Sequence, residues 1–268
     1  MKTAKTLGLC GLFAAASLAH GQVLLVPNSS PDELWALDAT TGDVITTVAL
    51  DFTSTPINAI DGPAGTILLS DQVDDTIYQL DSNGALIGDY ITAPIDNIRG
   101  IHRFPNGIVG GATTDGIFAW DTNGDLRAEF IDGDFFDVDF INNLIVGASL
   151  GDDNVQAYNL GLTLVGQSAP GSIDFPEQVT FARGGVLAVA SFSDESVVFV
   201  NPDGSIASSF PLRNGGNGRG IYQLPSGNFI VTDNTNGIDE YDSRGNFIRN
   251  IASGSSFRFI DVSRNFTP

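Results

Sequence analysis

The chain has few of the residue types on which catalytic and redox sites depend. It contains one cysteine, Cys10, two histidines, and lysines only at positions 2 and 5. Without residues 1–21, which have the features of a secretion signal, no cysteine and no lysine remain, and His102 is the one imidazole base. Disulfides, thiolate metal sites, cysteine nucleophiles and Schiff-base lysines are therefore excluded from the predicted mature protein.

Long apolar runs are also scarce, and the one at the N-terminus has the pattern of a signal peptide. Lys2 and Lys5 precede an apolar stretch at 7–18, and Ala19-His20-Gly21 fits a small-x-small cleavage site. The stretch is shorter than the roughly 18–20 residues that span a bilayer. We predict a signal peptide at 1–21 and a single domain at 22–268, secreted to the extracellular space or the periplasm without membrane insertion.

Positively charged residues are also few. After residue 21 the chain has 10 arginines against 32 acidic residues, so its net charge is about −22. Such a surface repels nucleic acids and anionic membranes. Many of the acids are aspartates at turns, where Asp is favoured for conformational reasons. We expect a monomer whose partner is an extracellular protein, a glycan or a small molecule.

A repeat of about 40 residues fills the rest of the chain. Residues 219–247 read RGIYQLPSGNFIVTDNTNGIDEYDSRGNF, which is four short strands separated by polar turns. The ends of the third strands recur at intervals of 43, 40, 38, 42 and 41 residues, at Asp38, Asp81, Asp121, Asn159, Asn201 and Asp242. Four strands in each period near 40 residues are typical of β-propeller blades.

The number of strands predicts how the ring closes. The first copy has only three strands, and a strand within 257–266 supplies the missing innermost one. We therefore predict an all-β, six-bladed β-propeller with four-stranded antiparallel blades, in which a C-terminal strand completes the N-terminal blade. Closure of this kind removes exposed sheet edges.

The repeat resembles the NHL repeat of six-bladed propellers. Residues 219–247, and RGIHRFPNGIVGGATTDGIFAWDTNG at 99–124, have a Gly-Ile first strand, a Gly turn, and a third strand that ends in an Asp and a Gly hairpin. The superfamily also contains gluconolactonase-like and strictosidine-synthase-like enzymes. The resemblance implies a ligand site at one mouth of the central channel, beside the loops between second and third strands and the starts of the innermost strands.

The residues that start the innermost strands form the first candidate site. Aligned, they read Asn58-Ala59-Ile60, Arg99-Gly100-Ile101, Phe136-Asp137-Val138, Glu177-Gln178-Val179, Arg219-Gly220-Ile221 and Ile260-Asp261-Val262. The third position is always aliphatic and predicts core between blades, whereas the first two bring polar groups together. We predict a ligand site formed by Arg99, Arg219, Glu177, Asn58, Asp71 and Asp233, in which the two arginines bind a carboxylate or phosphate of the ligand. The alternative is that the arginines form structural ion pairs with Glu177, Asp71 and Asp233.

An acidic run forms the second candidate site. Asp132, Asp134, Asp137 and Asp139 lie within eight residues, at a loop that leads into a strand. Carboxylate oxygens in such number could bind Ca²⁺, which takes six to eight oxygen ligands. The run does not match an EF-hand loop, and a solvated acidic turn is the alternative interpretation.

His102 is a candidate general base, because imidazole titrates near neutral pH. In our alignment the other copies carry Asp61, Asp139, Thr180, Tyr222 and Ser263 at its position, so the position tolerates polar groups and could face the channel. A hydrogen-bonded structural histidine is the alternative.

These observations leave two predicted functions for the protein. One is a non-catalytic binding module that uses the channel mouth, and the other is a Ca²⁺-dependent hydrolase, lactonase or lyase with its site there.

Overall fold

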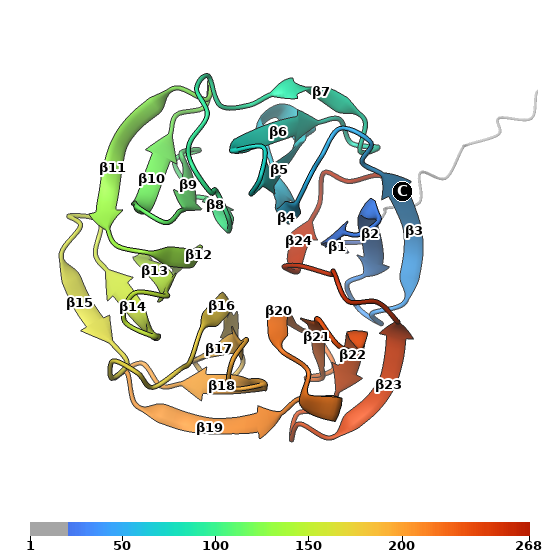
Figure 1. Cartoon of the computed structure of the whole chain (residues 1–268), viewed down its shortest axis with the longest axis vertical. Helices are drawn as coiled ribbons and strands as arrows, with labels where there is room; N and C mark the ends of the chain where they lie inside the picture. Colours follow the sequence, from blue (N-terminus) through green and yellow to red (C-terminus); the bar gives the residue numbers. More distant parts are fainter. Residues whose placement is uncertain (1–20) are drawn as a thin grey trace, which may run out of the picture.

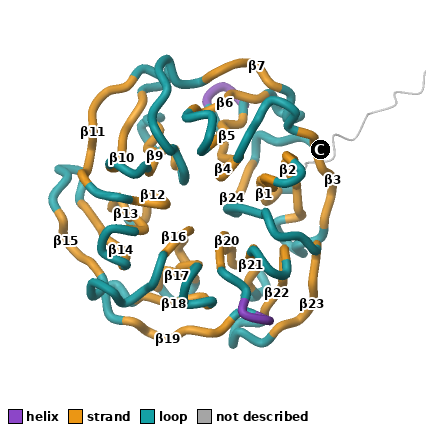
Figure 2. The backbone as a smooth tube through the Cα atoms, viewed as in Figure 1, coloured by secondary structure: helices purple, strands orange, loops and turns teal. Residues whose placement is uncertain are grey.

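The chain forms a ring of six sheets around a central channel (Figures 1 and 2). This computed structural model describes residues 21–268, without the side chains of 128–130. Residues 1–20 of the predicted signal peptide lie outside the described residues. In the described part of the chain, no helix has the length and apolarity that crossing a membrane requires.

Each sheet is a four-stranded antiparallel blade, which confirms the predicted six-bladed propeller. In order from the channel outward, blade 1 contains β24 (Asp261–Ser263), β1 (Val23–Ser29), β2 (Asp32–Asp38) and β3 (Val44–Ala49). Blade 2 contains β4 (Pro56–Asp61), β5 (Ile67–Asp71), β6 (Thr76–Leu80) and β7 (Leu86–Asp89). Blade 3 contains β8 (Ile101–Arg103), β9 (Val109–Ala112), β10 (Gly116–Trp120) and β11 (Leu126–Asp132).

The other three blades follow the same order. Blade 4 contains β12 (Phe135–Ile141), β13 (Leu144–Ser149), β14 (Asn154–Tyr158) and β15 (Leu164–Gln167). Blade 5 contains β16 (Pro176–Ala182), β17 (Val186–Ser191), β18 (Ser196–Val200) and β19 (Ile206–Pro211). Blade 6 contains β20 (Gly218–Gln223), β21 (Phe229–Asp233), β22 (Gly237–Tyr241) and β23 (Phe247–Ala252). The two short 3₁₀ helices, η1 (Pro63–Gly65) and η2 (Arg213–Gly215), lie in connections.

The sequence of each strand matches how deeply the strand is buried in its blade. The second strands are buried on both faces and read as nearly continuous apolar runs, as in ILLSD of β5 and FIVTD of β21. The outermost strands are mostly exposed, as in β3 and β15. The apolar faces of neighbouring blades pack together; Leu25 and Leu34 of blade 1, for example, share a cluster with Leu69 of blade 2. The core is therefore a set of layers between blades.

The turns between third and fourth strands have the chemistry that their sequences predict. Asp81 Oδ1 accepts the N–H groups of Asn83 and Ala85, and Asp242 Oδ1 accepts the equivalent pair in blade 6. A glycine at positive φ completes the turn. At Gly124 the contact is also close, because a Cβ there would lie 1.6 Å from the Tyr90 carbonyl oxygen.

The C-terminal strand closes the ring as predicted. β24 pairs with β1, with Val262 opposite Leu24. Asp61 of blade 2 accepts hydrogen bonds from the Ser263 hydroxyl and from the N–H groups of Arg264 and Asn265. The last residues of the chain are thereby fixed to both the first and the second blade.

Candidate functional site

One face of the ring carries the connections from the outermost strand of each blade to the innermost strand of the next. These connections lie in front in Figure 1, and we call this side the mouth face. The loops between second and third strands join them there, as the hydrogen bonds from Gln72 N–H to Thr55 and from Asn234 N–H to Asn217 show. The predicted ligand side of the propeller is therefore a single continuous surface around the channel.

The structure corrects the alignment of the closing strand. Arg258 N–H donates to the Pro27 carbonyl oxygen in the same way that Arg99 N–H donates to that of Ala112. Phe259 N–H donates to the Ile57 carbonyl oxygen as Gly100 N–H donates to that of Phe136, so Phe259 is equivalent to Gly100. The closing strand therefore starts with residues 258–260, two residues earlier than the predicted 260–262.

The alignment of blade 2 is also wrong, by one residue. Asn58 pairs with Ser70 in the position that Gly220 and Thr232 occupy in blade 6. Blade 2 therefore starts with residues 57–59. The corrected alignment places Arg258 level with Arg99 and Arg219, and sequence reasoning missed it. The signal was present, because Arg-x-Ile at 258–260 repeats Arg-Gly-Ile at 99–101 and 219–221.

A layer of six residues, three of them polar, lies in the channel below its mouth, and we call it the channel belt. Its members occupy the second position of the corrected alignment: Asn58, Gly100, Asp137, Gln178, Gly220 and Phe259. Asn58 Oδ1 accepts the Ile101 N–H at 2.9 Å, and Asp137 Oδ2 accepts the Val179 N–H at 2.9 Å. Innermost strands have unpaired edges, and the belt satisfies them. Asn58 and Asp137 thus link neighbouring blades.

A second layer, the mouth ring, lies above the belt. It contains the first residue of each innermost strand: Ile57, Arg99, Phe136, Glu177, Arg219 and Arg258. Arg219 Nη1 lies 3.0 Å from Glu177 Oε1, which is the predicted ion pair. Arg99 Nη1 instead lies 2.6 Å from Asp134 Oδ1 and donates to the Phe135 carbonyl oxygen. Three guanidinium groups therefore gather at the channel mouth of an acidic protein.

The guanidinium groups and Glu177 are poorly hydrated. Burial raises the pKa of Glu177 to about 7, although the charges of Arg219, Arg258 and Arg99 lower it. Burial also lowers the pKa of Arg258 to about 10, and the Arg219 charge lowers it further. The Nε atoms of Arg99 and Arg219 are buried and have no hydrogen-bond partner in the described part of the chain. The site therefore has donors that its own acceptors do not satisfy.

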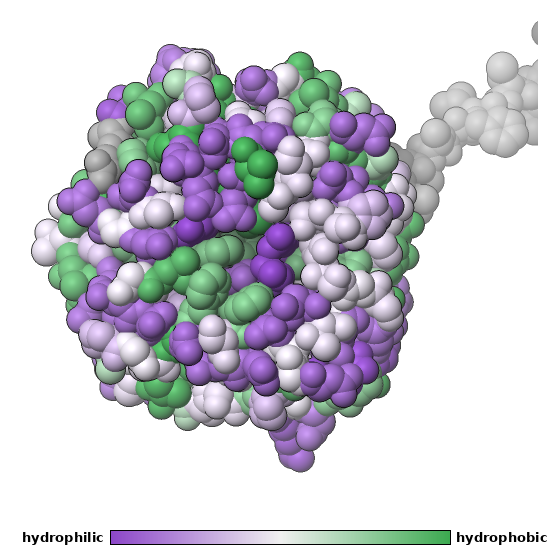
Figure 3. All heavy atoms as spheres, viewed as in Figure 1, coloured by the Kyte–Doolittle hydropathy of each residue, from purple (hydrophilic) through white to green (hydrophobic). Residues whose placement is uncertain are grey.

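Aromatic rings support these cations. The Arg99 guanidinium lies 4.8 Å from the centre of the Phe136 ring, and that of Arg219 lies 4.9 Å from the Phe192 ring. Phe175 joins the two rings, at 5.7 Å from Phe136 and 5.3 Å from Phe192. Figure 3, drawn from the mouth-face side, shows hydrophobic side chains near the centre with strongly hydrophilic ones beside them. The mouth is thus both cationic and apolar.

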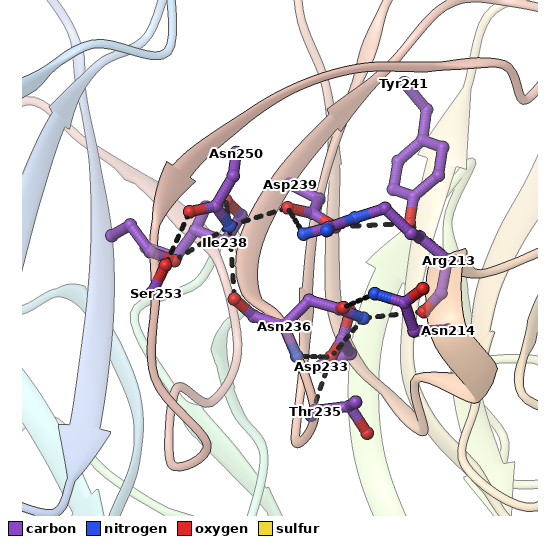
Figure 4. Close-up of polar contacts among 11 residues, drawn as sticks. Arg213, Asn214, Asp233, Thr235, Asn236, Ile238, Asp239, Tyr241, Asn250 and Ser253 are labelled. Atoms are coloured by element: carbon purple, nitrogen blue, oxygen red, sulfur yellow. Dashed lines mark hydrogen bonds and ion pairs between the residues drawn. The ribbon is translucent and has the colours of Figure 1, made fainter.

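Asp233 lies apart from the mouth ring, in a polar network of blade 6 (Figure 4). It accepts the N–H groups of Thr235 and Asn236 and the side-chain amide of Asn236. Asn236 also donates to the Arg213 carbonyl oxygen, and Arg213 forms an ion pair with Asp239 at 3.1 Å. Asp233 therefore fixes the loop between β21 and β22.

Asp71 has the equivalent role in blade 2. It accepts N–H groups of Ser54 and Thr55 from one loop, and of Val73 and Asp74 from the next. The alternative in which Asp71 and Asp233 pair with the mouth arginines is therefore wrong. The two carboxylates are used to cap loops, a use that aspartate in turns commonly has.

The four aspartates of the acidic run point to different surroundings. Asp132 is exposed at the end of β11, Asp134 pairs with Arg99, and Asp137 belongs to the channel belt. Asp139 contacts His102. Among residues 21–268 as described, no group of three or more His, Cys, Asp or Glu side chains is placed to hold a metal ion. The calcium site remains a prediction.

His102 lies on the opposite side of the belt from the mouth ring. Its Nδ1 lies 3.0 Å from Asp139 Oδ1. Burial lowers the pKa of His102, but the hydrogen bond and charge of Asp139 and the charge of Asp261 raise it more, so the net shift is upward from 6.5. Burial raises the pKa of Asp261 to about 7. His102 therefore belongs to a small proton-binding cluster within the channel.

Comparison with known proteins is informative about the fold. No family model and no curated protein matches the chain. Among solved structures, a Bacteroides caccae protein of unknown function is 16% identical, with a TM-score of 0.70 and 91% of this chain and 99% of that chain covered. A chain of a nidogen/laminin complex is 14% identical, with a TM-score of 0.74 and coverages of 92% and 100%. A streptogramin B lyase is also 14% identical, with a TM-score of 0.62 and coverages of 88% and 85%. These similarities show that the chain is a six-bladed β-propeller.

Proposed function

We propose that the protein is a secreted, non-catalytic binding module, in which the mouth ring binds an anionic group of an extracellular protein, a glycan or a small molecule. The supporting observation is the gathering of Arg99, Arg219 and Arg258 at one mouth of a chain whose net charge is −20. The NHL-like repeat pattern and the predicted signal peptide at 1–21 are consistent with this role. One solved propeller of the same fold belongs to a protein complex, that of nidogen and laminin.

The energetics of the mouth favour an anion. Buried donors without acceptors destabilise the folded protein. Guanidinium groups form their strongest hydrogen bonds with carboxylates and phosphates, often through two parallel N–H groups. Arg258 donates from Nε to the Ser29 hydroxyl and forms no ion pair within 4.0 Å among the described residues. A bound anion would therefore give Arg258 the charged partner that the described residues do not supply.

An enzymatic role as a hydrolase, lactonase or lyase, with Ca²⁺ as a cofactor, is the second candidate. The observation that favours it is the His102–Asp139 pair, because a carboxylate that orients an imidazole is a common arrangement in general-base catalysis. Two of the solved structures with this fold are streptogramin B and virginiamycin B lyases. The channel belt lies between His102 and the mouth ring, so one ligand at the mouth would not reach the imidazole.

Thermal unfolding with a panel of anions tests the binding function. Carboxylates, phosphates, and sulfated and uronic-acid glycans are each added to the mature protein. We expect at least one class to raise the melting temperature, since a ligand that binds only the folded state stabilises it. The increase should disappear in Arg219→Gln and Arg258→Gln. It should persist in Arg244→Gln, which changes an exposed arginine in the hairpin after β22.

Two results would contradict the proposal. One is stabilisation by an anion that the mouth variants retain in full. The other is stabilisation by Ca²⁺ alone, reversed by a chelator, retained in Arg258→Gln and lost in His102→Ala or Asp139→Asn. The second result would favour the enzymatic candidate.

A further inference from the structure

We infer that the anion bound at the mouth ring is a monocarboxylate attached to a flat apolar group, with its carboxylate between Arg219 and Arg258 and its apolar part against Phe175 and Phe192. This inference rests on the proposed binding function and specifies the ligand class. It follows from the charge of the site, the free edges of its guanidinium groups and the apolar surface beside them.

The charge of the site matches one negative charge. Arg99 and Arg219 each have a carboxylate partner, Asp134 and Glu177 respectively. Arg258 adds a third positive charge, and no described carboxylate lies within 4.0 Å of it. A monoanion would neutralise this excess. A phosphate monoester carries close to two negative charges at pH 7, and would leave an unpaired negative charge near Glu177, which is 1% exposed.

The geometry of Arg258 suits a carboxylate. Its Nε donates to the Ser29 hydroxyl at 3.1 Å, which holds one edge of the guanidinium against blade 1. The two Nη groups remain for a ligand, and this pair of donors matches the two oxygens of a carboxylate. Arg219 occupies the neighbouring position of the mouth ring, and its charge already lowers the pKa of Arg258. A carboxylate placed between them would relieve this repulsion.

The neighbouring surface suits an apolar group. Phe175 and Phe192 are partly exposed, and their ring centres lie 5.3 Å apart. Leu150 and Phe175 pack on the buried cluster of Ile57, Phe136 and Phe259. Because the protein's net charge of −20 repels free anions at long range, a small hydrophilic anion would gain little from the site. Apolar contact would supply the additional binding energy.

The test is isothermal titration calorimetry of the mature protein with four probes. They are 3-phenylpropionate, its neutral amide 3-phenylpropanamide, acetate and phenyl phosphate. We expect 3-phenylpropionate to bind at least about tenfold more tightly than each of the other three. Arg258→Gln should weaken the binding of 3-phenylpropionate by about tenfold or more. Arg258→Lys should weaken it less, because lysine keeps the positive charge but lacks the paired N–H donors of the guanidinium group. Arg244→Gln is the matched control and should bind normally.

The number of protons taken up on ligand binding is a second measurement. If Arg258 had only a structural role, no protons would be taken up on binding. The pKa of Glu177 is about 7, and the mouth arginines lower it. A carboxylate bound to those arginines offsets their effect and raises this pKa. Binding at pH 7 should therefore take up protons, which calorimetry in buffers of different ionisation enthalpy detects. Glu177→Gln should abolish the uptake.

The outcomes separate the inference from the function on which it rests. Tighter binding of phenyl phosphate, or equal binding of the neutral amide, would overturn the inference and leave an anion-binding or ligand-binding mouth in place. Binding of 3-phenylpropionate that Arg258→Gln does not weaken would also overturn it. If none of the four probes binds, the monocarboxylate class is wrong, and the anion panel decides the proposed function independently.

Discussion

The Gly100→Ala variant is expected to lose about 3–5 kcal/mol of its free energy of unfolding. A Cβ at Gly100 would lie 2.0 Å from Asp137 Oδ1 and 2.8 Å from Asp137 Cα. Asp137 has little freedom to move, because its other carboxylate oxygen accepts the Val179 N–H and the side chain is buried. The alanine would therefore separate blades 3 and 4 at the channel belt. Chemical denaturation of both proteins measures the difference.

Gly88→Ala is the matched control for this variant. Gly88 lies in the outermost strand of blade 2, and a Cβ there meets no atom within 4 Å. We expect its free energy of unfolding to change by less than about 1 kcal/mol. Equal effects of the two substitutions would show that close packing in the channel belt does not determine the stability of the ring.

The free energy of unfolding is expected to be greatest near roughly pH 4–5 and to fall as the pH rises toward about 8. Burial raises the pKa of Glu177 to about 7 and that of Asp261 to about 7, and it raises the pKa of Asp137 well above its usual range. Between the unfolded and the folded pKa, the folded protein holds a proton that the unfolded chain has lost. Unfolding then releases protons, so a rise in pH favours unfolding.

The size of this effect follows from the shifts. For Glu177 the shift from 4.5 to about 7 corresponds to about 3 kcal/mol. The net upward shift of the His102 pKa acts in the same direction, since its contribution is lost as the pH rises through the folded value. Denaturant titrations from pH 4 to pH 8 measure the slope, and Asp261→Asn should reduce it. A stability that rises over this range, or an unchanged slope in Asp261→Asn, would contradict the explanation.

Periodic features of the sequence predict the fold because every blade repeats them. The third-strand anchors from Asp38 to Asp242, with the Gly hairpins that follow, determine the blade number and the strand order. The unpaired strand at the C-terminus predicts the closure that β24 makes with β1. Each of these features depends on local turn chemistry and strand periodicity, which a single sequence contains.

The candidate site was harder to predict because it depends on register. Four of the innermost strands, β4, β12, β16 and β20, have a register shift near their start, for example between Pro56 and Asn58 and between Gly218 and Gly220. A bulge inserts one residue without a strong sequence signal, so the alignment of blade 2 was wrong by one residue. The closing strand β24 has only three residues, and its alignment was wrong by two. The error in blade 1 removed Arg258 from the mouth ring and placed Asp261 in the second position, that of the channel belt, instead of beside His102.

The repeat pattern also does not predict which side chains of neighbouring loops contact each other. Arg99 pairs with Asp134, from the following blade, although the repeat does not specify which acid a loop turns toward the mouth. Asp71 and Asp233 fall at the same place in their copies and cap loops in both. Repeated aspartates were therefore structural, whereas the residues that vary between copies at the mouth ring form the candidate site.

The most direct test of the central claim is a crystal structure with 3-(4-iodophenyl)propionate, because the anomalous signal of iodine locates the ligand without assumptions about its pose. We expect an iodine peak beside Phe175 and Phe192, with carboxylate density between Arg219 and Arg258. We expect no such peak in crystals of Arg258→Gln. A peak at another surface, or the same peak in Arg258→Gln, would show that the mouth ring is not the binding site.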